Sequence, residues 1–283
     1  MSGFIRKCFF YFGLIFLIGS AAFIFITIYF SNHPFRFHYS TVFLGDSRVQ
    51  YLYYNKQNLA CNSESFYFNF LKIKSLNKQK HLDTVYLGCS HHSFSAYFDQ
   101  YAVNQEEILP RYYILEENKW KYLKKFDFTN LHFLFKKQFQ LGWESIKYRK
   151  NFIPGGCASP MNRMVDMNKL KKRIQQQFYY QNKIMPFSLN QLRYFDSIQN
   201  FCLLNQSKLI LINSPVHPEY RKNIPQKYLD QYLQKTQHLQ VLEMGDILTK
   251  DSDFMPDGDH ISWKAYLKCT HFINQKRHEF SQK

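Results

Sequence analysis

The longest apolar stretch of the chain lies near its N-terminus. Residues 8–30 carry no charged side chain. A run of about 23 such residues is long enough to cross a hydrocarbon core of roughly 30 Å as a helix. Arg6 and Lys7 precede it. Because positive charge favours the cytoplasmic end of a span, the pattern predicts a single-pass anchor in the inner or cytoplasmic membrane. We expect the N-terminus of the chain to lie in the cytoplasm and the residues after the anchor to lie outside.

A cleaved signal peptide is the alternative interpretation of this segment. The apolar core of a signal peptide has about 7–15 residues and is followed by small residues at the cleavage site. Here the small residues Gly-Ser-Ala-Ala at 19–22 stand in the middle of the apolar run. We therefore expect an uncleaved anchor over residues 1–30, followed by a linker over residues 31–40.

Beyond residue 40, short apolar runs alternate with segments of helical spacing. The clearest run, residues 208–213, has apolar residues at the four consecutive positions 209–212, which is typical of a strand buried on both faces. The alternation predicts an α/β fold with a central parallel sheet and right-handed crossovers. We expect strands at residues 41–44, 58–61, 84–87, 208–213 and 239–244, and helices at residues 49–54, 63–75, 188–205, 226–237 and 262–279.

Residues 102–185 interrupt this alternation. They are dense in Lys, Tyr and Phe and contain the turn Pro154-Gly155-Gly156. We interpret them as a helical insertion or cap within one α/β domain over residues 41–283, since about 250 residues beyond the anchor suit a single domain. Within the insertion, the basic stretch 163–173 indicates a solvated helix face, and a substrate-facing role is the alternative.

The net charge of +16 indicates a surface that attracts anions. Anionic lipid headgroups or an acidic glycan suit an anchored protein, and compositional bias toward lysine is the competing explanation. The sequence contains no helix-turn-helix, zinc-knuckle or RNA-binding motif, so a nucleic-acid partner is not expected.

The cysteines and histidines do not indicate a metal site or cofactor. Five cysteines lie outside the anchor, an odd number without CxxC spacing, so neither a disulfide framework nor a metal centre is expected. His91 and His92 are adjacent, and neighbouring side chains usually point in different directions. We weigh a metal role for them, with His217 or Asp99, as the lesser alternative.

A candidate nucleophile follows the first predicted strand. The sequence Gly45-Asp46-Ser47 places Ser47 at the carboxyl end of that strand, the edge of a parallel sheet where sites form. A serine hydroxyl is a weak nucleophile and needs a neighbouring base.

The base is expected near the C-terminus. Asp257 and His260 lie three residues apart on a loop before the last helix. With this spacing the carboxylate can turn back to the imidazole and hold the tautomer that accepts the serine proton. Asp259 competes for this orienting role, but a residue adjacent to the histidine usually points away from it.

Stabilisation of an oxyanion would require donors at the same edge. Backbone N–H groups of Ser47, of the turn at Asn62-Ser63 and of the turn at Gly88-Cys89-Ser90 are the candidates. We therefore expect Asn62, Gly88 and Ser90 to contact the oxyanion or the substrate.

These two motifs resemble the first and last blocks of the SGNH, or GDSL, hydrolase family. The resemblance covers residues 41–273 and implies a flavodoxin-like three-layer α/β/α domain with a triad that needs no metal. It implies Ser47 as nucleophile, His260 as base and Asp257 as the orienting carboxylate. Two positions depart from the family pattern: the glycine of the second block has no equivalent, and Ser90 stands where the family has an oxyanion asparagine.

The anchor and the resemblance together imply an extracytoplasmic serine esterase or O-acyltransferase. Its layout is similar to anchored proteins that modify cell-envelope polymers, such as the D-alanyl transfer protein of teichoic acid and exopolysaccharide O-acetyltransferases. The implied partners are an envelope glycan, an acyl donor, membrane lipid and other membrane proteins of such a pathway. A catalytically silent SGNH-like binding or assembly protein is the main alternative, and a lipid esterase is a third.

Overall fold

The computed structural model describes residues 2–32, 37–148, 155–161 and 163–281. The chain forms two compact units, one from residues 1–37 and 103–152 and the other from residues 38–102 and 153–283. Residues 33–36 of the expected linker and residue 154 of the expected turn lie outside the described ranges.

The first unit contains the N-terminal helix α1 (Ser2–Asn32). Its segment Gly3–Ala21 has a mean hydropathy of 1.6 and no buried residue, so it is long and apolar enough to cross a membrane. A signal sequence has the same property. The other elements of this unit are α5 (Leu109–Tyr112), η3 (Tyr113–Leu115), α6 (Lys119–Leu123), η4 (Phe128–Asn130) and α7 (Leu131–Tyr148).

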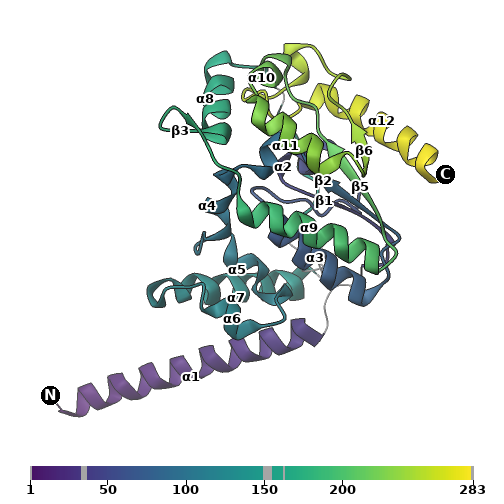
Figure 1. Cartoon of the computed structure of the whole chain (residues 1–283). Coiled ribbons are helices and arrows are strands. Elements are labelled where there is room, and N and C mark those ends of the chain that lie inside the picture. Colours follow the sequence, from purple (N-terminus) through teal and green to yellow (C-terminus); the bar gives the residue numbers. More distant parts are fainter. Residues whose placement is uncertain (1, 33–36, 149–154, 162, 282–283) are drawn as a thin grey trace. The chain divides into compact units, whose positions relative to one another are not determined.

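The second unit is built on a four-stranded sheet, and the predicted parallel pairing is confirmed. The strand order is β1-β2-β5-β6, and all three neighbouring pairs are parallel. The strands are β1 (Thr41–Leu44), β2 (Thr84–Gly88), β5 (Lys208–Asn213) and β6 (Gln240–Glu243). Figure 1 shows this sheet in the centre of the unit, with helices packed around it.

The strand expected at residues 58–61 is an edge segment joined to β1 by a single bridge, Phe43 to Asn58. The N–H of Leu59 donates to the carbonyl of Phe43 at 2.8 Å. The Asn58 amide has a different task, because its Nδ2 donates to the carbonyls of Val49 and Tyr53 at the end of α2 (Ser47–Leu52). Asn58 therefore joins the end of α2 through its side chain, while the backbone beside it bonds to β1.

One face of the sheet packs on α12 (Trp263–Ser281). Phe43, Tyr86 and Ile210 from three strands share a buried cluster with Ala265 and Ile273 from that helix. Alternate strand residues point to the opposite face.

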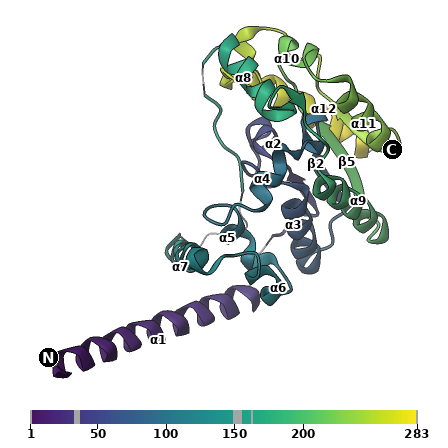
Figure 2. The same ribbon diagram turned by 60° about the vertical axis from the view of Figure 1, so that its left-hand side comes forward.

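Two further helices of this unit, α3 (Phe66–Gln79) and α9 (Leu189–Leu204), pack against each other and lie side by side in both views (Figures 1 and 2). The remaining elements of this unit are η1 (His91–Phe94), η2 (Ala96–Phe98), α4 (Asp99–Ala102), α8 (Met167–Phe178), β3 (Tyr179–Tyr180), β4 (Lys183–Ile184), α10 (Pro218–Lys222), α11 (Gln226–Thr236) and η5 (Asp251–Asp253).

The segment expected as one insertion, residues 102–185, is divided between the two units. Residues 103–152 group with the N-terminal helix, whereas α8 and the β3–β4 hairpin group with the sheet. The helical content expected there is present in both parts.

Two glycines allow the ends of β1 and β2 to approach each other closely. Gly45 has φ +144°, and a Cβ on Gly88 would lie 2.4 Å from Cγ2 of Val49 and 3.4 Å from Cα of Gly45. Val49 is branched at Cβ and has little rotamer freedom in a helix. A side chain at residue 88 would therefore push α2 away from the sheet.

We predict that Gly88→Ala lowers the free energy of unfolding by about 1–3 kcal/mol through overpacking. Chemical unfolding of the full chain measures this loss. Val49→Ala in the same chain should recover part of it, because the clashing methyl group is removed. Gly13→Ala is the control, since a Cβ there meets no atom within 4 Å. Equal effects of Gly88→Ala and the control would contradict the close approach.

Candidate active site

The turn that presents Ser47 is fixed by its own sequence. β1 ends at Leu44, Gly45 turns the chain, and Asp46 caps α2 by accepting the N–H of Arg48 at 3.0 Å. Aspartate is a favoured N-cap because its carboxylate satisfies an N–H group that has no partner within the helix. Ser47 is thereby the first residue of α2, at the carboxyl edge of the sheet.

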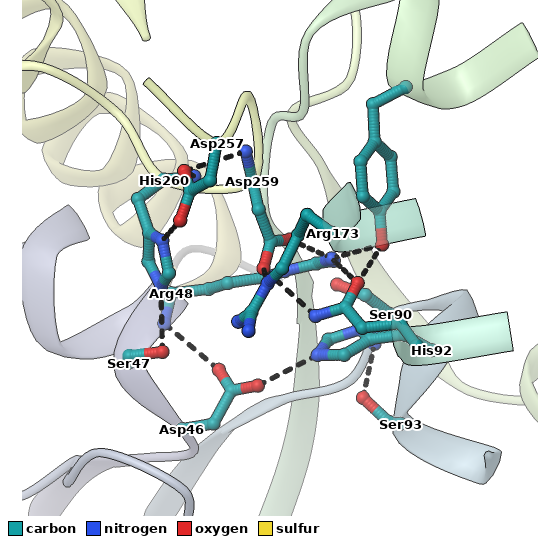
Figure 3. A network of polar contacts seen from close by, with 12 residues as sticks. Asp46, Ser47, Arg48, Ser90, His92, Ser93, Arg173, Asp257, Asp259 and His260 are labelled. Atoms are coloured by element: carbon teal, nitrogen blue, oxygen red, sulfur yellow. Dashed lines mark hydrogen bonds and ion pairs between the residues drawn. The ribbon is translucent and has the colours of Figure 1, made fainter. Parts of the chain in front are cut away.

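The structure brings Ser47, His260 and Asp257 into one hydrogen-bonded chain (Figure 3). Nε2 of His260 lies 2.7 Å from Oγ of Ser47. Nδ1 of the same ring lies 2.7 Å from Oδ2 of Asp257. Both lengths are those of strong hydrogen bonds. Asp257 also accepts the backbone N–H of Asp259 at 3.1 Å, which fixes the loop between the carboxylate and the imidazole.

The electrostatics of Asp257 suit an ionised carboxylate. Burial acts to raise its pKa, but the hydrogen bond and charge of His260 lower the pKa below its ordinary value. An ionised Asp257 accepts a hydrogen bond from the Nδ1–H of the ring, which leaves Nε2 unprotonated and able to accept a hydrogen bond from the hydroxyl of Ser47. This is the tautomer that a general base requires.

The imidazole is hydrogen-bonded to Asp257 and not to Asp259, as we expected, and the Asp259 carboxylate is paired with two arginines. Arg48 forms an ion pair with it, and Nε of Arg173 donates to its Oδ2 at 2.7 Å (Figure 3). Nε2 of Gln177 donates to the same oxygen at 2.9 Å. Burial acts to raise the pKa of Asp259, but the two guanidinium groups hold the pKa well below its usual range.

This network includes two arginines for which we predicted no role at the site. Arg173 was placed on a solvated helix face, but its head group contacts Asp259 and donates to the hydroxyl of Tyr97 at 3.1 Å. Arg48 is 5% exposed and donates to the hydroxyl of Tyr220 at 2.9 Å. Leu170, Ile174 and Phe178 on α8 are buried. Their spacing of four residues in the sequence was the signal that one face of this helix points inward.

His92 contacts the serine turn and was missed as a site residue. Its Nε2 lies 2.9 Å from Oδ2 of Asp46. Burial and the charge of Arg48 lower the pKa of His92. Burial acts to raise the pKa of Asp46, but His92 and Arg48 lower that pKa overall. A neutral His92 therefore donates to an ionised Asp46 and holds the carboxylate that caps α2.

The residues expected to serve an oxyanion are placed differently. Asn62 is exposed. The N–H of Ser90 donates to Oγ of Ser93 at 3.0 Å, and that of Cys89 donates to the carbonyl of Ile212 at 2.9 Å. Gly88 serves the close packing of α2 against the sheet. The backbone N–H groups of Cys89 and Ser90 are thus already bonded, so they do not serve as the oxyanion donors that we expected.

A small cavity of about 60 Å³ adjoins Ser47. It is lined by Asp46, Ser47, Ser63, His92, Tyr97, Phe98, Tyr101, Arg173 and Gln177. Of the expected turn at residues 62–63, only Ser63 lines this cavity. Its φ of 61° lies in the left-handed region. Asn62, Gly88 and Ser90 are not among the lining residues.

A cation site was also considered at the C-terminal loop. Ligand atoms of Asp257, Asp259 and His260 converge within 4.8 Å of one another. However, Asp259 is already paired with Arg48 and Arg173, and Nδ1 of His260 is bonded to Asp257. A divalent cation there would have to displace two guanidinium groups, so these donors fit a salt-bridge network better than a metal.

Comparison with known proteins does not assign a function to this chain. No protein-family model matches the chain, and no curated protein matches its sequence. A solved structure from Streptococcus pneumonia, described provisionally as a platelet activating factor, aligns with 94% of this chain and 98% of that chain. The identity is 11% and the TM-score 0.35. A likeness this loose carries no argument.

We predict that Asp259→Asn lowers the free energy of unfolding at neutral pH by about 3–5 kcal/mol, because two buried cations lose their counter-ion. Since the folded pKa is depressed, the carboxylate stabilises the fold above about pH 4 and loses this effect as pH falls toward the folded pKa. The variant should therefore lose less stability than the wild type on acidification below about pH 4.

Unfolding titrations at several pH values check both statements. Asp246→Asn is the matched control, because Asp246 pairs with Arg221 while its side chain is 95% exposed. Exposed pairs contribute about 0–1 kcal/mol. If the two variants behaved alike, Asp259 would not be the anchor of a structural network.

Proposed function

We propose that this protein is a serine esterase or O-acyltransferase that works through an acyl-enzyme. The observation that carries the proposal is the pair of 2.7 Å contacts from Ser47 to His260 and from His260 to Asp257. We further propose that the α/β unit is an SGNH-like domain of the flavodoxin-like type. The parallel sheet, with the serine after its first strand and the histidine before the last helix, supports this assignment.

In the proposed reaction, Nε2 of His260 removes the proton of Ser47 as Oγ attacks the ester carbonyl. The carbonyl oxygen becomes an oxyanion, and Asp257 stabilises the imidazolium that has formed. His260 then returns the proton to the departing alkoxide, which leaves an acyl group on Ser47. Water or a sugar hydroxyl then attacks this ester as it loses its proton to the same nitrogen. His260 returns that proton to Oγ of Ser47 as the acyl bond breaks, which restores the free serine and releases an acid or an acylated sugar.

Backbone N–H groups are the proposed oxyanion donors. The N–H of Ser47 lies in the first turn of α2, where N–H groups have no partner within the helix. Ser63 is the proposed second donor, because it lines the cavity that adjoins Ser47. Two such donors are typical of an oxyanion hole.

The proposed acyl acceptor is a glycan of the cell envelope. A cavity of about 780 Å³ lies beside the small one and shares Tyr97, Tyr101 and Arg173 with it. Tyr179 and Tyr180 also line this cavity, as do Gln100 and Gln176. Tyrosine rings offer flat apolar faces with polar tips, and amide side chains hydrogen-bond hydroxyl groups. An extracytoplasmic site on a single-pass anchor, with the N-terminus in the cytoplasm, completes the proposal.

The second candidate function is a catalytically silent SGNH-like protein that binds glycan or assembles partner proteins. The occupied N–H groups of Cys89 and Ser90 favour it, because they remove donors that we expected at the oxyanion. A reactivity experiment separates the two candidates.

We predict that a fluorophosphonate probe labels the wild type at Ser47 and does not label Ser47→Ala. Acyl transfer from a small ester should fall by several orders of magnitude in Ser47→Ala and in His260→Ala. The double variant should lose little more, because residues that act as one unit are not additive. Asp257→Asn should cost on the order of 10⁴-fold, since the ring loses its preferred tautomer.

Ser90→Ala is the control for this set. A true oxyanion donor costs about 10²–10³ in rate when it is removed. We expect a near wild-type rate, because the N–H of Ser90 is bonded to Ser93 and is retained in the variant. A wild type that neither reacts with the probe nor turns over an ester would establish the binding-protein candidate instead.

A further inference from the structure

The first unit exposes a row of aromatic side chains on helix α7. Leu134 and Gln138 of this helix are buried, and Nε2 of Gln138 donates to the carbonyl of Pro110 at 2.5 Å. One position further along each turn, Phe135, Phe139 and Trp143 are 45%, 58% and 60% exposed. They recur at a spacing of four residues, so they form one stripe on the helix. We refer to these three residues as the aromatic stripe.

The elements that precede α7 have the same character. Trp120 on α6 is 79% exposed, and Phe128 on η4 is 90% exposed. Single exposed apolar residues are ordinary, but contiguous patches of large ones mark protein or membrane contacts. Two of the three tryptophans of the chain belong to this small unit.

The neighbourhood of α7 identifies the partner as a lipid bilayer. α7 and α1 belong to the same compact unit and contact each other. The segment Gly3–Ala21 of α1 is apolar enough to span a membrane and none of it is buried. Because α7 contacts the helix that carries this segment, it is held close to the bilayer that α1 would span.

The composition of the surface fits the boundary between headgroups and acyl chains. Tryptophan is enriched at that level of the membrane because its ring is apolar and its N–H is polar. Lys121, Lys124 and Lys136 are exposed on the same unit, and lysines near the surface are attracted to anionic lipids. An amphipathic helix with aromatic residues on one face and lysines on another lies in the plane of the interface.

We propose that the aromatic stripe inserts into the headgroup region of the anionic bilayer that holds α1. The protein would then meet the membrane through two elements, one spanning it and one lying on it. This proposal does not depend on the acyl-transfer activity. A second copy of the chain or the α/β unit of the same chain are the other occupants, and the experiment distinguishes them.

The three tryptophans provide the test. The full chain is reconstituted in vesicles of phosphatidylglycerol and phosphatidylethanolamine whose acyl chains carry bromine, which quenches tryptophan fluorescence on contact. A variant with Trp120→Phe and Trp263→Phe reports on Trp143 alone. A variant with Trp120→Phe and Trp143→Phe reports on Trp263, which stacks on Tyr266 in the α/β unit at a ring distance of 5.3 Å.

We expect brominated lipid to remove most of the emission of Trp143 and little of that of Trp263. Phe139→Ser should reduce the quenching of Trp143, because the neighbouring anchor on the stripe is lost. Leu204→Ser is the matched control, since Leu204 on α9 is 82% exposed but lies in the other unit. It should leave the quenching unchanged.

Three results would overturn the proposal. If the emission of Trp143 is quenched by aqueous acrylamide but not by brominated lipid, its ring faces water. Trp143 that resists both quenchers is covered by protein, either a second copy or the α/β unit. Equal quenching of Trp143 and Trp263 means that contact with lipid is not specific to the aromatic stripe.

Discussion

The site depends on one buried ion pair, between Arg48 and Asp259. Each residue is the chain neighbour of a reactive group, because Arg48 follows Ser47 and Asp259 precedes His260. A bond between the two neighbours therefore holds the start of α2 against the C-terminal loop. The 2.7 Å contact between Ser47 and His260 is a consequence of this arrangement as much as of their own attraction.

Burying such a pair is costly unless its remaining bonding capacity is satisfied. Arg173 and Gln177 from α8 supply donors to Asp259, and Tyr220 from α10 accepts from Arg48. The helices α8 and α10 are thus both bonded to the ion pair of Arg48 and Asp259. Asp46 and His92 secure the other side of the serine turn in the same manner. The polar network and the apolar core beneath it specify the same position for α2.

Local chemistry in this chain was readable from sequence, and long-range chemistry was not. The strands at residues 41–44 and 208–213 follow from apolar runs, and the pairing of Asp257 with His260 follows from a spacing of three residues. Nothing near Arg173 or His92 in sequence indicates their partners, because these lie on other elements. The strand expected at residues 58–61 is reduced to one bridge at Asn58, and no local pattern indicated that the side chain of Asn58 also binds the end of α2. The bond from the N–H of Ser90 to the Oγ of Ser93 is as local as the pairing of Asp257 with His260. We did not predict it, because we expected this N–H group at the oxyanion.

The topology of the sheet has a consequence for how the protein folds. β2 pairs with β5, more than a hundred residues later, and β5 in turn pairs with β6. Contacts between such distant segments slow folding, because the loop entropy is lost before the pairing stabilises the chain. β1 and β2 are synthesised before β5, so the edge of β2, which carries Val85, Tyr86 and Leu87, stays unpaired until β5 arrives. Such an edge can pair with another chain, so aggregation during synthesis is the characteristic hazard of this topology.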